Sequence, residues 1–426
     1  MNIRLSAHFA NYGCHRSITG TSVDKAITSG KPVAQEFDLN SGSKNATLGM
    51  MRSSRGLATA CRRMMLGFLA LSAFLVAGPQ TFAAPVEVTD FGSNPGNLRM
   101  FKHIPSGLPA SPPLVVVLHG CTQNARDFAA QSGWIELADR LHVALALPEQ
   151  TQGNNPRNCF NWFVISHNRR GQGEALSIRQ MVDKMKSDHG IDPSRVFVTG
   201  LSAGGAMTSV MLATYPEVFA GGGIIAGLPY GCANDPSQFV ATQALQCMSS
   251  GHPSSLPGLS GLPGTTTGFP PFTFPLPPGV CQLFPLPICP SGTSAASGFT
   301  ASQLGDFVRQ ASSHTGPFPK VSIWHGSSDP TVSPANASEE MLQWTNVHGV
   351  KPEPAVSDTV NGFPHHVFKN AAGNAVVETF SITAMGHGDP VDPGTGPNQC
   401  GIAAPFVLDV NICSSLFLAK FWGLAP

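Results

Sequence analysis

The stretch Arg195-Val-Phe-Val-Thr-Gly-Leu-Ser-Ala-Gly-Gly-Ala206 decides the fold of this chain. Its apolar first half is β-branched or aromatic and predicts a buried strand, and residues 203–212 predict a helix. Between them stands the pattern Gly-x-Ser-x-Gly, with Ser202 at its centre. A strand, a sharp turn that carries a serine and a helix together predict a nucleophile elbow, with the hydroxyl near the N-terminus of the helix. The alternative is a turn that happens to contain a serine.

The two outer glycines of this pattern have a steric role in such a turn. We expect that a Cβ atom at Gly200 or Gly204 would collide with the neighbouring strand and helix. A nucleophile elbow also requires an acid and a histidine further along the chain, in that order after the serine.

Composition limits the possible functions. The chain has 426 residues, a formal net charge of +0 and only 12% charged residues. No basic tract predicts a nucleic-acid partner. No C-x-x-C or paired His/Cys spacing predicts zinc, and we expect neither a metal nor a cofactor. The 45 glycines and 37 prolines indicate long loops.

Residues 51–83 have the composition of a secretory signal peptide. Arginines fill its first part, an apolar run follows at 66–77, and Thr81-Phe-Ala83 offers small residues for cleavage. The run is shorter than the ~20 residues of an ordinary membrane span. We expect export to the periplasm or the medium, with no stable membrane span after cleavage; the alternative is an uncleaved anchor. Residues 1–50 are expected to be a disordered or artefactual extension.

Eight of the ten cysteines follow the predicted signal peptide. An even set of cysteines behind an export signal predicts disulfides. The eight are Cys121, Cys159, Cys232, Cys247, Cys281, Cys289, Cys400 and Cys413.

Strand and helix patterns alternate through residues 84–426, which we expect to form a single α/β domain. Such alternation predicts an open, mostly parallel sheet with helices on both faces. A Pro/Gly-rich insertion without usable periodicity interrupts it at about 251–298, and could serve as a lid, an adsorption surface or a passive loop. The expected strands are 86–91, 98–104, 112–120, 143–147, 196–198, 221–226, 320–326 and 375–382, and the expected helices 128–141, 174–189, 203–212, 301–311, 338–347 and 415–422.

The residues that would complete the chemistry of Ser202 stand at strand ends. A serine is a weak nucleophile, so a base must take its proton. His387 lies in a glycine-flanked loop after the last predicted strand, and Asp329 follows the strand at 320–326. Asp389 and Asp392 are alternative acids, but they follow the histidine and so break the expected order. The alternative histidines are His119, His314, His325, His365 and His366.

Other predicted site residues surround these three. The backbone N–H groups of Ala203 and Cys121 are candidates for an oxyanion hole. Trp162 and Phe163 lie in an aromatic loop after a strand, where loops shape the binding crevice; the alternative is ordinary aromatic packing. Trp324 is a further candidate for substrate contact.

The chain resembles the poly(3-hydroxybutyrate) depolymerase family of secreted α/β-hydrolase esterases. The resemblance implies the α/β-hydrolase fold, the triad Ser202, Asp329 and His387, and Cys121 as an oxyanion donor. It also implies the disulfide pairs Cys121–Cys159, Cys232–Cys247 and Cys400–Cys413; the pair Cys281–Cys289 is our own inference. The matching stretches are 118–123, 159–163, 200–206, 227–233, 324–332 and 385–387, which read LHGCTQ, CFNWF, GLSAGGA, GLPYGCA, WHGSSDPTV and MGH.

We therefore expect a secreted serine esterase that hydrolyses poly(3-hydroxybutyrate) or its oligomers through an acyl-enzyme. The alternative keeps the mechanism but acts on feruloyl or acetyl esters of plant polysaccharides. A third hypothesis is a non-catalytic polymer-binding protein on the same scaffold. Extracellular members of the family often carry a separate polymer-binding domain, which we do not expect in a chain that ends at Pro426. The oligomeric state is not predicted.

Overall fold

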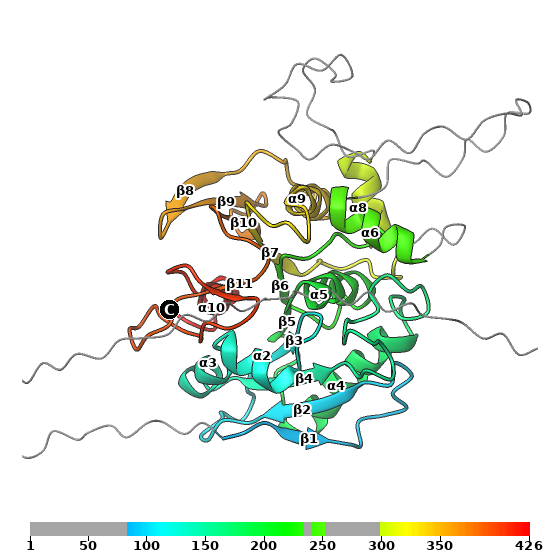
Figure 1. Ribbon diagram of the computed structural model, residues 1–426, viewed down its shortest axis with the longest axis vertical. Helices are drawn as coiled ribbons and strands as arrows, with labels where there is room; N and C mark the ends of the chain where they lie inside the picture. Colours follow the sequence, from blue (N-terminus) through cyan, green and yellow to red (C-terminus); the bar gives the residue numbers. More distant parts are fainter. Residues whose placement is uncertain (1–82, 234–239, 252–298) are drawn as a thin grey trace, which may run out of the picture. The chain divides into compact units, whose positions relative to one another are not determined.

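A mixed ten-stranded sheet organises the part of the chain that the computed structural model describes, residues 83–233, 240–251 and 299–426 (Figure 1). The predicted N-terminal extension, almost all of the signal peptide and nearly the whole insertion, with Cys281 and Cys289, lie outside these residues. The strand order is β1-β2-β4-β3-β5-β6-β7-β10-β9-β8.

Six consecutive strands in this order are parallel, and two antiparallel strands flank them at each edge. The parallel strands are β4 (Ala144–Glu149), β3 (Leu114–Leu118), β5 (Val196–Leu201), β6 (Gly221–Ile225), β7 (Lys320–Gly326) and β10 (Ala375–Ile382). The edge strands are β1 (Val86–Val88), β2 (Arg99–His103), β8 (Val356–Val360) and β9 (Phe363–Lys369). The predicted mostly parallel sheet is confirmed.

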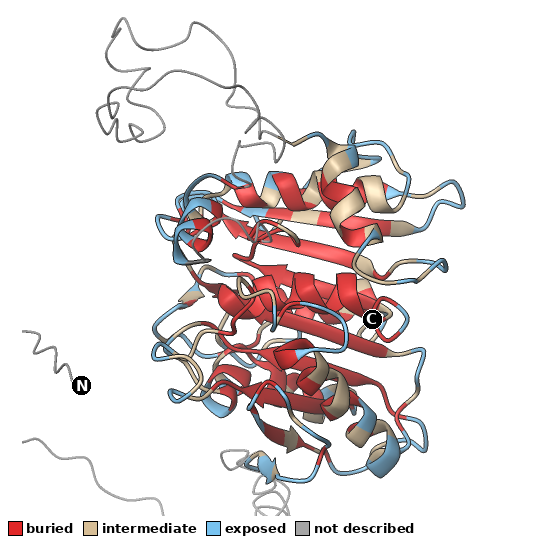
Figure 2. Cartoon of the chain, turned by 90° about the vertical axis from the view of Figure 1, so that its right-hand side faces the viewer, coloured by how far each residue is buried: buried red, intermediate tan, exposed pale blue. Residues whose placement is uncertain are grey.

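Helices cover both faces of this sheet, and successive strand residues alternate between two cores. Val116 packs in the core under α4 (Gly173–His189), α5 (Ala203–Thr214), α8 (Ala301–Arg309) and α9 (Ala335–Val347). Val115 and Val117 pack in the core under α2 (Ala125–Gln131), α3 (Trp134–Leu141) and α10 (Ser414–Trp422). Figure 2 shows the strands and the inner sides of the helices buried between these layers. Such strands are continuous apolar runs because both faces are covered.

Some elements differ from the prediction. The single helix expected at 128–141 is two helices, because Gly133 between them has a left-handed φ of 86°. A Cβ at Gly133 would also lie 2.8 Å from the backbone nitrogen of Gly401, so this turn is tightly packed. The elements that were not predicted are α6 (Val240–Ser250), the β8–β9 hairpin, and the small parallel pair β11 (Asp389–Val391) and β12 (Val407–Asp409).

The turn between β5 and α5 has the strained geometry of a nucleophile elbow. Ser202 has φ 58° and ψ −117°, and its backbone N–H donates to the carbonyl of Ile225 at 2.9 Å. A Cβ at Gly200 would lie 2.6 Å from the Leu118 carbonyl oxygen, and one at Gly204 would lie 2.7 Å from the His119 carbonyl oxygen. Both glycines are therefore required by backbone contacts, as the sequence predicts.

Three of the expected disulfides are present, Cys121–Cys159, Cys232–Cys247 and Cys400–Cys413. The first joins the loop after β3 to the loop after β4. The second ties α6 to the loop that follows β6. Each closes a loop of 13 to 38 residues, which removes entropy from the unfolded chain.

Replacing Gly204 with alanine should destabilise the protein by about 1–3 kcal/mol, because the new methyl group meets backbone atoms that cannot turn away. The free energy of unfolding in urea measures this. Gly153→Ala is the matched control, since a Cβ there meets nothing within 4 Å. Equal stability of the two variants would contradict the steric role of Gly204.

Candidate active site

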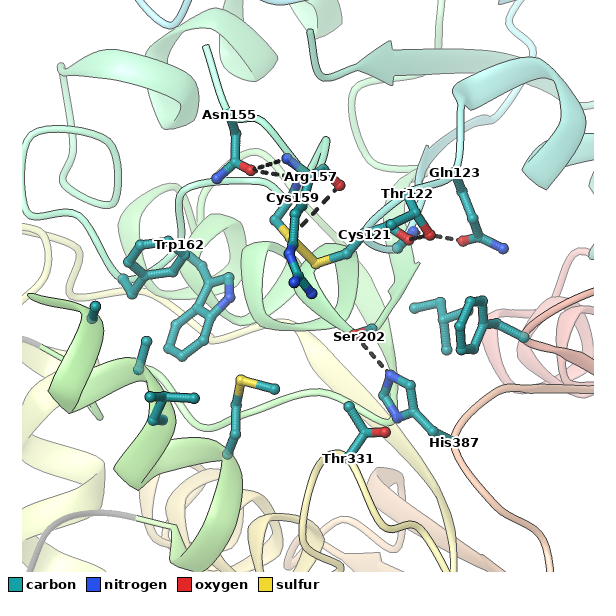
Figure 3. A pocket seen from close by; sticks show the side chains of 18 residues that line it. Cys121, Thr122, Gln123, Asn155, Arg157, Cys159, Trp162, Ser202, Thr331 and His387 are labelled. Atoms are coloured by element: carbon teal, nitrogen blue, oxygen red, sulfur yellow. Dashed lines mark hydrogen bonds between the residues drawn. A yellow bond between two sulfur atoms is a disulfide. The ribbon is translucent and has the colours of Figure 1, made fainter. Parts of the chain in front are cut away.

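The loops after three parallel strands bring together the serine, histidine and aspartate that the sequence predicts. Ser202 follows β5, Asp329 follows β7, and His387 lies between β10 and β11. His387 Nε2 is 2.9 Å from Ser202 Oγ, and its Nδ1 is 2.7 Å from Asp329 Oδ2. Figure 3 shows the hydroxyl of Ser202 facing the imidazole. One continuous chain of hydrogen bonds thus runs from a buried carboxylate to a serine hydroxyl.

The buried Asp329 carboxylate is held in its charged form. Burial alone would raise its pKa, but hydrogen bonds from His325, His387 and the Val332 N–H hold that pKa well below its ordinary range. The other oxygen, Oδ1, accepts from the N–H groups of Thr331 and Val332 at 2.8 and 2.9 Å. An ionised Asp329 accepts the Nδ1 proton of His387, which leaves the Nε2 lone pair directed at Ser202.

The alternative acids and most of the alternative histidines have partners elsewhere, but His325 Nε2 also lies 3.4 Å from Asp329 Oδ2. Asp389 accepts a hydrogen bond from Ser414 Oγ at 2.5 Å, and Asp392 accepts one from Gln399 Nε2 at 3.2 Å. Among the described histidines, His387 is the one that bonds to Ser202. Of the others, His314 bonds to Pro317, His365 to Asp358 and Glu378, His366 to Ser357, and His325 to Val332.

His119 shapes the loop that follows β3. The Gln150 N–H donates to His119 Nε2 at 3.1 Å, so the proton of the neutral ring is on Nδ1, which donates to the Gly120 carbonyl at 2.7 Å. Burial lowers the pKa of His119 to about 4, so the ring is neutral at pH 7. His119 therefore supports this loop through its contacts with Gly120 and Gln150.

Cys121 and Ala203, the predicted oxyanion donors, both adjoin Ser202. Leu118 pairs with Gly200 in the sheet, so the loop that starts after β3 begins beside the elbow. Ala203 is the first residue of α5, and a first-turn N–H has no acceptor within its own helix. Neither N–H donates to any group in the described part of the chain.

The serine and histidine open into a cavity of about 620 Å³ (Figure 3). Its surface is mainly apolar. Trp162 and Phe163, the predicted substrate-contacting pair, both line it and meet edge to face with ring centroids 5.3 Å apart. The full lining is Gly120, Cys121, Thr122, Gln123, Asn155, Arg157, Cys159, Trp162, Phe163, Leu201, Ser202, Ala241, Ala244, Leu245, Met248, Thr331, His387 and Phe406.

One wall of the cavity is α6, which the sequence analysis missed. Its contributing residues are Ala241, Ala244, Leu245 and Met248. Their spacing of three, four and seven residues is the apolar pattern of a helix face, and this signal would have identified the wall. The Cys232–Cys247 disulfide anchors it.

Trp324 does not line this cavity, in contrast to the expectation. Its side chain is fully buried, stacks on Phe380 with centroids 3.7 Å apart and donates from Nε1 to Ser322 Oγ at 2.8 Å. The alternation of side chains along β7 turns the indole into the core on the side of α10.

Glu174 supports the loop that carries Trp162 and Phe163. Its buried carboxylate accepts from the backbone N–H of Asn161 at 2.7 Å and from the side-chain amides of Asn161 and Gln150, each at 2.6 Å. Burial raises its pKa to about 7, although these hydrogen bonds act in the opposite direction. The carboxylate thus fixes the backbone next to Trp162. An isolated glutamate at the start of a helix gives no such signal in the sequence.

Comparison with known proteins now identifies the family. A model of the family described as esterase PHB depolymerase matches residues 102–258. Poly(3-hydroxyalkanoate) depolymerase C of Paucimonas lemoignei is 47% identical over 375 residues, which cover 88% of this chain and 78% of that protein. The chain belongs to the PHB depolymerase esterase family. It is therefore a serine carboxylic-ester hydrolase with the α/β-hydrolase fold, and the predicted family and enzyme class are confirmed.

Other relatives of this esterase share its scaffold. The acetylxylan esterase of Coprinopsis cinerea is 32% identical over 312 residues, covering 71% of this chain and 69% of that protein. The solved acetyl xylan esterase from Aspergillus awamori superposes with a TM-score of 0.58 at 22% identity, covering 80% of this chain and 100% of that one. This structural likeness shows the fold.

Two kinds of feature are absent from the described residues of the esterase. No group of three or more His, Cys, Asp or Glu side chains there could hold a metal ion. No helix there is both long enough and apolar enough to cross a bilayer.

Asp389 should make stability depend on pH. Burial raises the pKa of Asp389 to about 7, so the folded protein favours the protonated carboxyl. The stabilisation that results is complete below the pKa of the unfolded chain, near 4, and is lost as the pH rises through 7. As the pH rises from 4 to 8, the free energy of unfolding of Asp389→Asn should increase by up to about 4 kcal/mol relative to that of wild type. Unfolding in urea at several pH values measures this gain.

Asp409→Asn, which changes an exposed carboxylate of β12, is the control and should show no such trend. A pH-independent difference between Asp389→Asn and wild type would contradict the assignment of a neutral Asp389.

Proposed function

We propose that this esterase hydrolyses poly(3-hydroxyalkanoate) chains or their oligomers, with Ser202 as nucleophile, His387 as base and Asp329 as the residue that orients it. The hydrogen-bonded chain from Asp329 to Ser202 at the mouth of an apolar cavity carries the proposal. The 47% identity to a poly(3-hydroxyalkanoate) depolymerase supports the substrate class.

The first half of the reaction acylates the serine. Ser202 Oγ attacks the ester carbonyl carbon while His387 Nε2 takes its proton. The carbonyl oxygen becomes negative and accepts hydrogen bonds from the N–H groups of Ala203 and Cys121; loss of one such donor typically costs ~3 kcal/mol. The carbon–oxygen bond then breaks, and the leaving alcohol takes the proton from His387.

The second half releases the acid. A water molecule attacks the acyl carbon while His387 Nε2 takes one of its protons. The bond between the acyl carbon and Ser202 Oγ then breaks, and His387 returns the proton to Ser202 Oγ. The ionised Asp329 stabilises the imidazolium in both halves, and the hydrogen bonds from Thr331 and Val332 keep its carboxylate in place. The apolar walls of the cavity suit a hydroxyacyl unit with a short alkyl side chain.

An alternative substrate is an acetyl or feruloyl ester of a plant polysaccharide. Relatives named acetylxylan esterase and feruloyl esterase B, each 32% identical to this chain, favour it. Their identity is lower than that of the depolymerase, so the polyester is the stronger proposal. A non-catalytic binding role is the weakest, because binding alone gives no reason for the three-residue hydrogen-bonded chain.

We further propose that the protein is secreted. Three disulfides in the described residues suit an oxidising compartment. The proposed signal peptide at 51–83 would direct export.

Ser202→Ala should lower kcat by about 10⁶, because the nucleophile is lost. Asp329→Asn should lower it by about 10⁴, because the imidazole then takes the wrong tautomer. Asp392→Asn is the control, since Asp392 bonds to Gln399 away from the site, and should remain active. Turnover of p-nitrophenyl acetate measures all three. Substantial activity in Ser202→Ala would reject the proposed nucleophile.

Purified protein should release 3-hydroxybutyrate from an amorphous poly(3-hydroxybutyrate) suspension or from its soluble oligomers faster than it hydrolyses methyl ferulate or acetylated xylan. Product acids are measured by chromatography, and Ser202→Ala gives the background. If only the plant-wall esters were hydrolysed, the alternative substrate would replace the polyester.

A further inference from the structure

One cationic side chain faces the cavity beside the nucleophile. Arg157 lies in the loop between β4 and α4, and Figure 3 shows its guanidinium extending past the Cys121–Cys159 disulfide toward Ser202. Among the described lining residues, Arg157 and His387 are the titratable ones, and no carboxylate lines the cavity. The cavity therefore presents a fixed positive charge on mainly apolar walls.

Unlike several arginines of the fold, Arg157 has no carboxylate partner in the described part of the chain. Arg99, Arg170 and Arg309 each pair with a carboxylate at 2.7 Å. Within the described part of the chain, no hydrogen bond or ion pair is formed by the Arg157 side chain, which is exposed. Its five N–H donors are free to bind a ligand.

The backbone of Arg157 is fixed relative to the proposed oxyanion loop. Its carbonyl accepts from the Thr122 N–H at 2.6 Å, and its own N–H donates to Asn155 Oδ1 at 3.0 Å. Two residues later Cys159 is bonded to Cys121. The guanidinium is thus carried by a loop that is clamped to the loop beside the nucleophile.

The substrate class proposed above has one group that matches this charge. A linear hydroxyalkanoate oligomer ends in a single carboxylate, which belongs to the fragment that leaves as the alcohol. A guanidinium binds a carboxylate through two parallel hydrogen bonds, and the low polarity of the walls strengthens that pairing. An interior stretch of polymer has no such charge.

We propose that Arg157 binds the terminal carboxylate of hydroxyalkanoate oligomers and thereby selects free-acid chains. The inference rests on the proposed polyester function. When the ester bond breaks, its alcohol oxygen takes the proton from His387, and the released hydroxy acid keeps its carboxylate at Arg157 until it diffuses away. Arg157 is a specificity residue in this scheme and takes no part in bond breaking.

The test compares a linear 3-hydroxybutyrate trimer as the free acid with its methyl ester, which lacks the charge. The readout is the ratio of their kcat/KM values. Wild type should prefer the acid, and Arg157→Gln should lower the ratio about tenfold, mainly through KM, because a charged hydrogen bond is lost. Arg157→Lys, which keeps the charge, should lie between them. Arg169→Gln removes an exposed arginine outside the cavity and should leave the ratio unchanged.

An unchanged ratio in Arg157→Gln, or a wild type without preference for the acid, would overturn the inference. Cleavage of neither trimer, with p-nitrophenyl acetate still hydrolysed, would instead reject the polyester function. Arg157 is then judged by inhibition of p-nitrophenyl acetate hydrolysis with 3-hydroxybutyrate. A Ki about tenfold higher in Arg157→Gln would support a carboxylate site, and an equal Ki would overturn it.

Discussion

The close contact between helix α5 and strands β3 and β5 is the constraint on which the site depends. At this point there is no room for a Cβ at Gly200 or Gly204, and the chain turns through a left-handed φ at Ser202. Every residue of α5 is buried, so the helix cannot shift to relieve the turn. The packing around the turn stabilises this strained backbone conformation. As a result the serine hydroxyl is held at a fixed height above the sheet, and the other site residues are placed relative to it.

Much of the fold and the three central residues could be predicted from the sequence. A parallel strand buried on both faces is a continuous apolar run, and for that reason the stretch 112–120 was predicted as a strand and contains β3. The strand predicted at 320–326, with its glycine end, has the bounds of β7. Ser202, Asp329 and His387 stand just after such runs, in loops that meet at one edge of a parallel sheet. Local patterns were therefore enough to bring together side chains that lie up to 185 residues apart.

The walls of the cavity were harder to predict, because they depend on the directions of side chains and on contacts between loops. Trp324 is of a residue type that often contacts substrates, but its side chain points into the core. The alternation of side chains along the strand and the stacking on Phe380 decide this direction. Glu174 accepts four hydrogen bonds from three residues of the long loop that precedes its helix, and its own sequence context implies none of them. The helix α6 had a readable pattern, but its place beside Ser202 follows only from the tertiary structure.

The Cys121–Cys159 disulfide gives the site a mechanical property. It joins the segment of Cys121, the proposed oxyanion donor, to the segment that carries Arg157 and the aromatic residues Trp162 and Phe163. A displacement of the wall that these aromatic residues form would be transmitted through the disulfide to the loop of Cys121, which lies beside Ser202. Because of this covalent link, the wall that contacts the substrate and the loop beside Ser202 are positioned together and not independently.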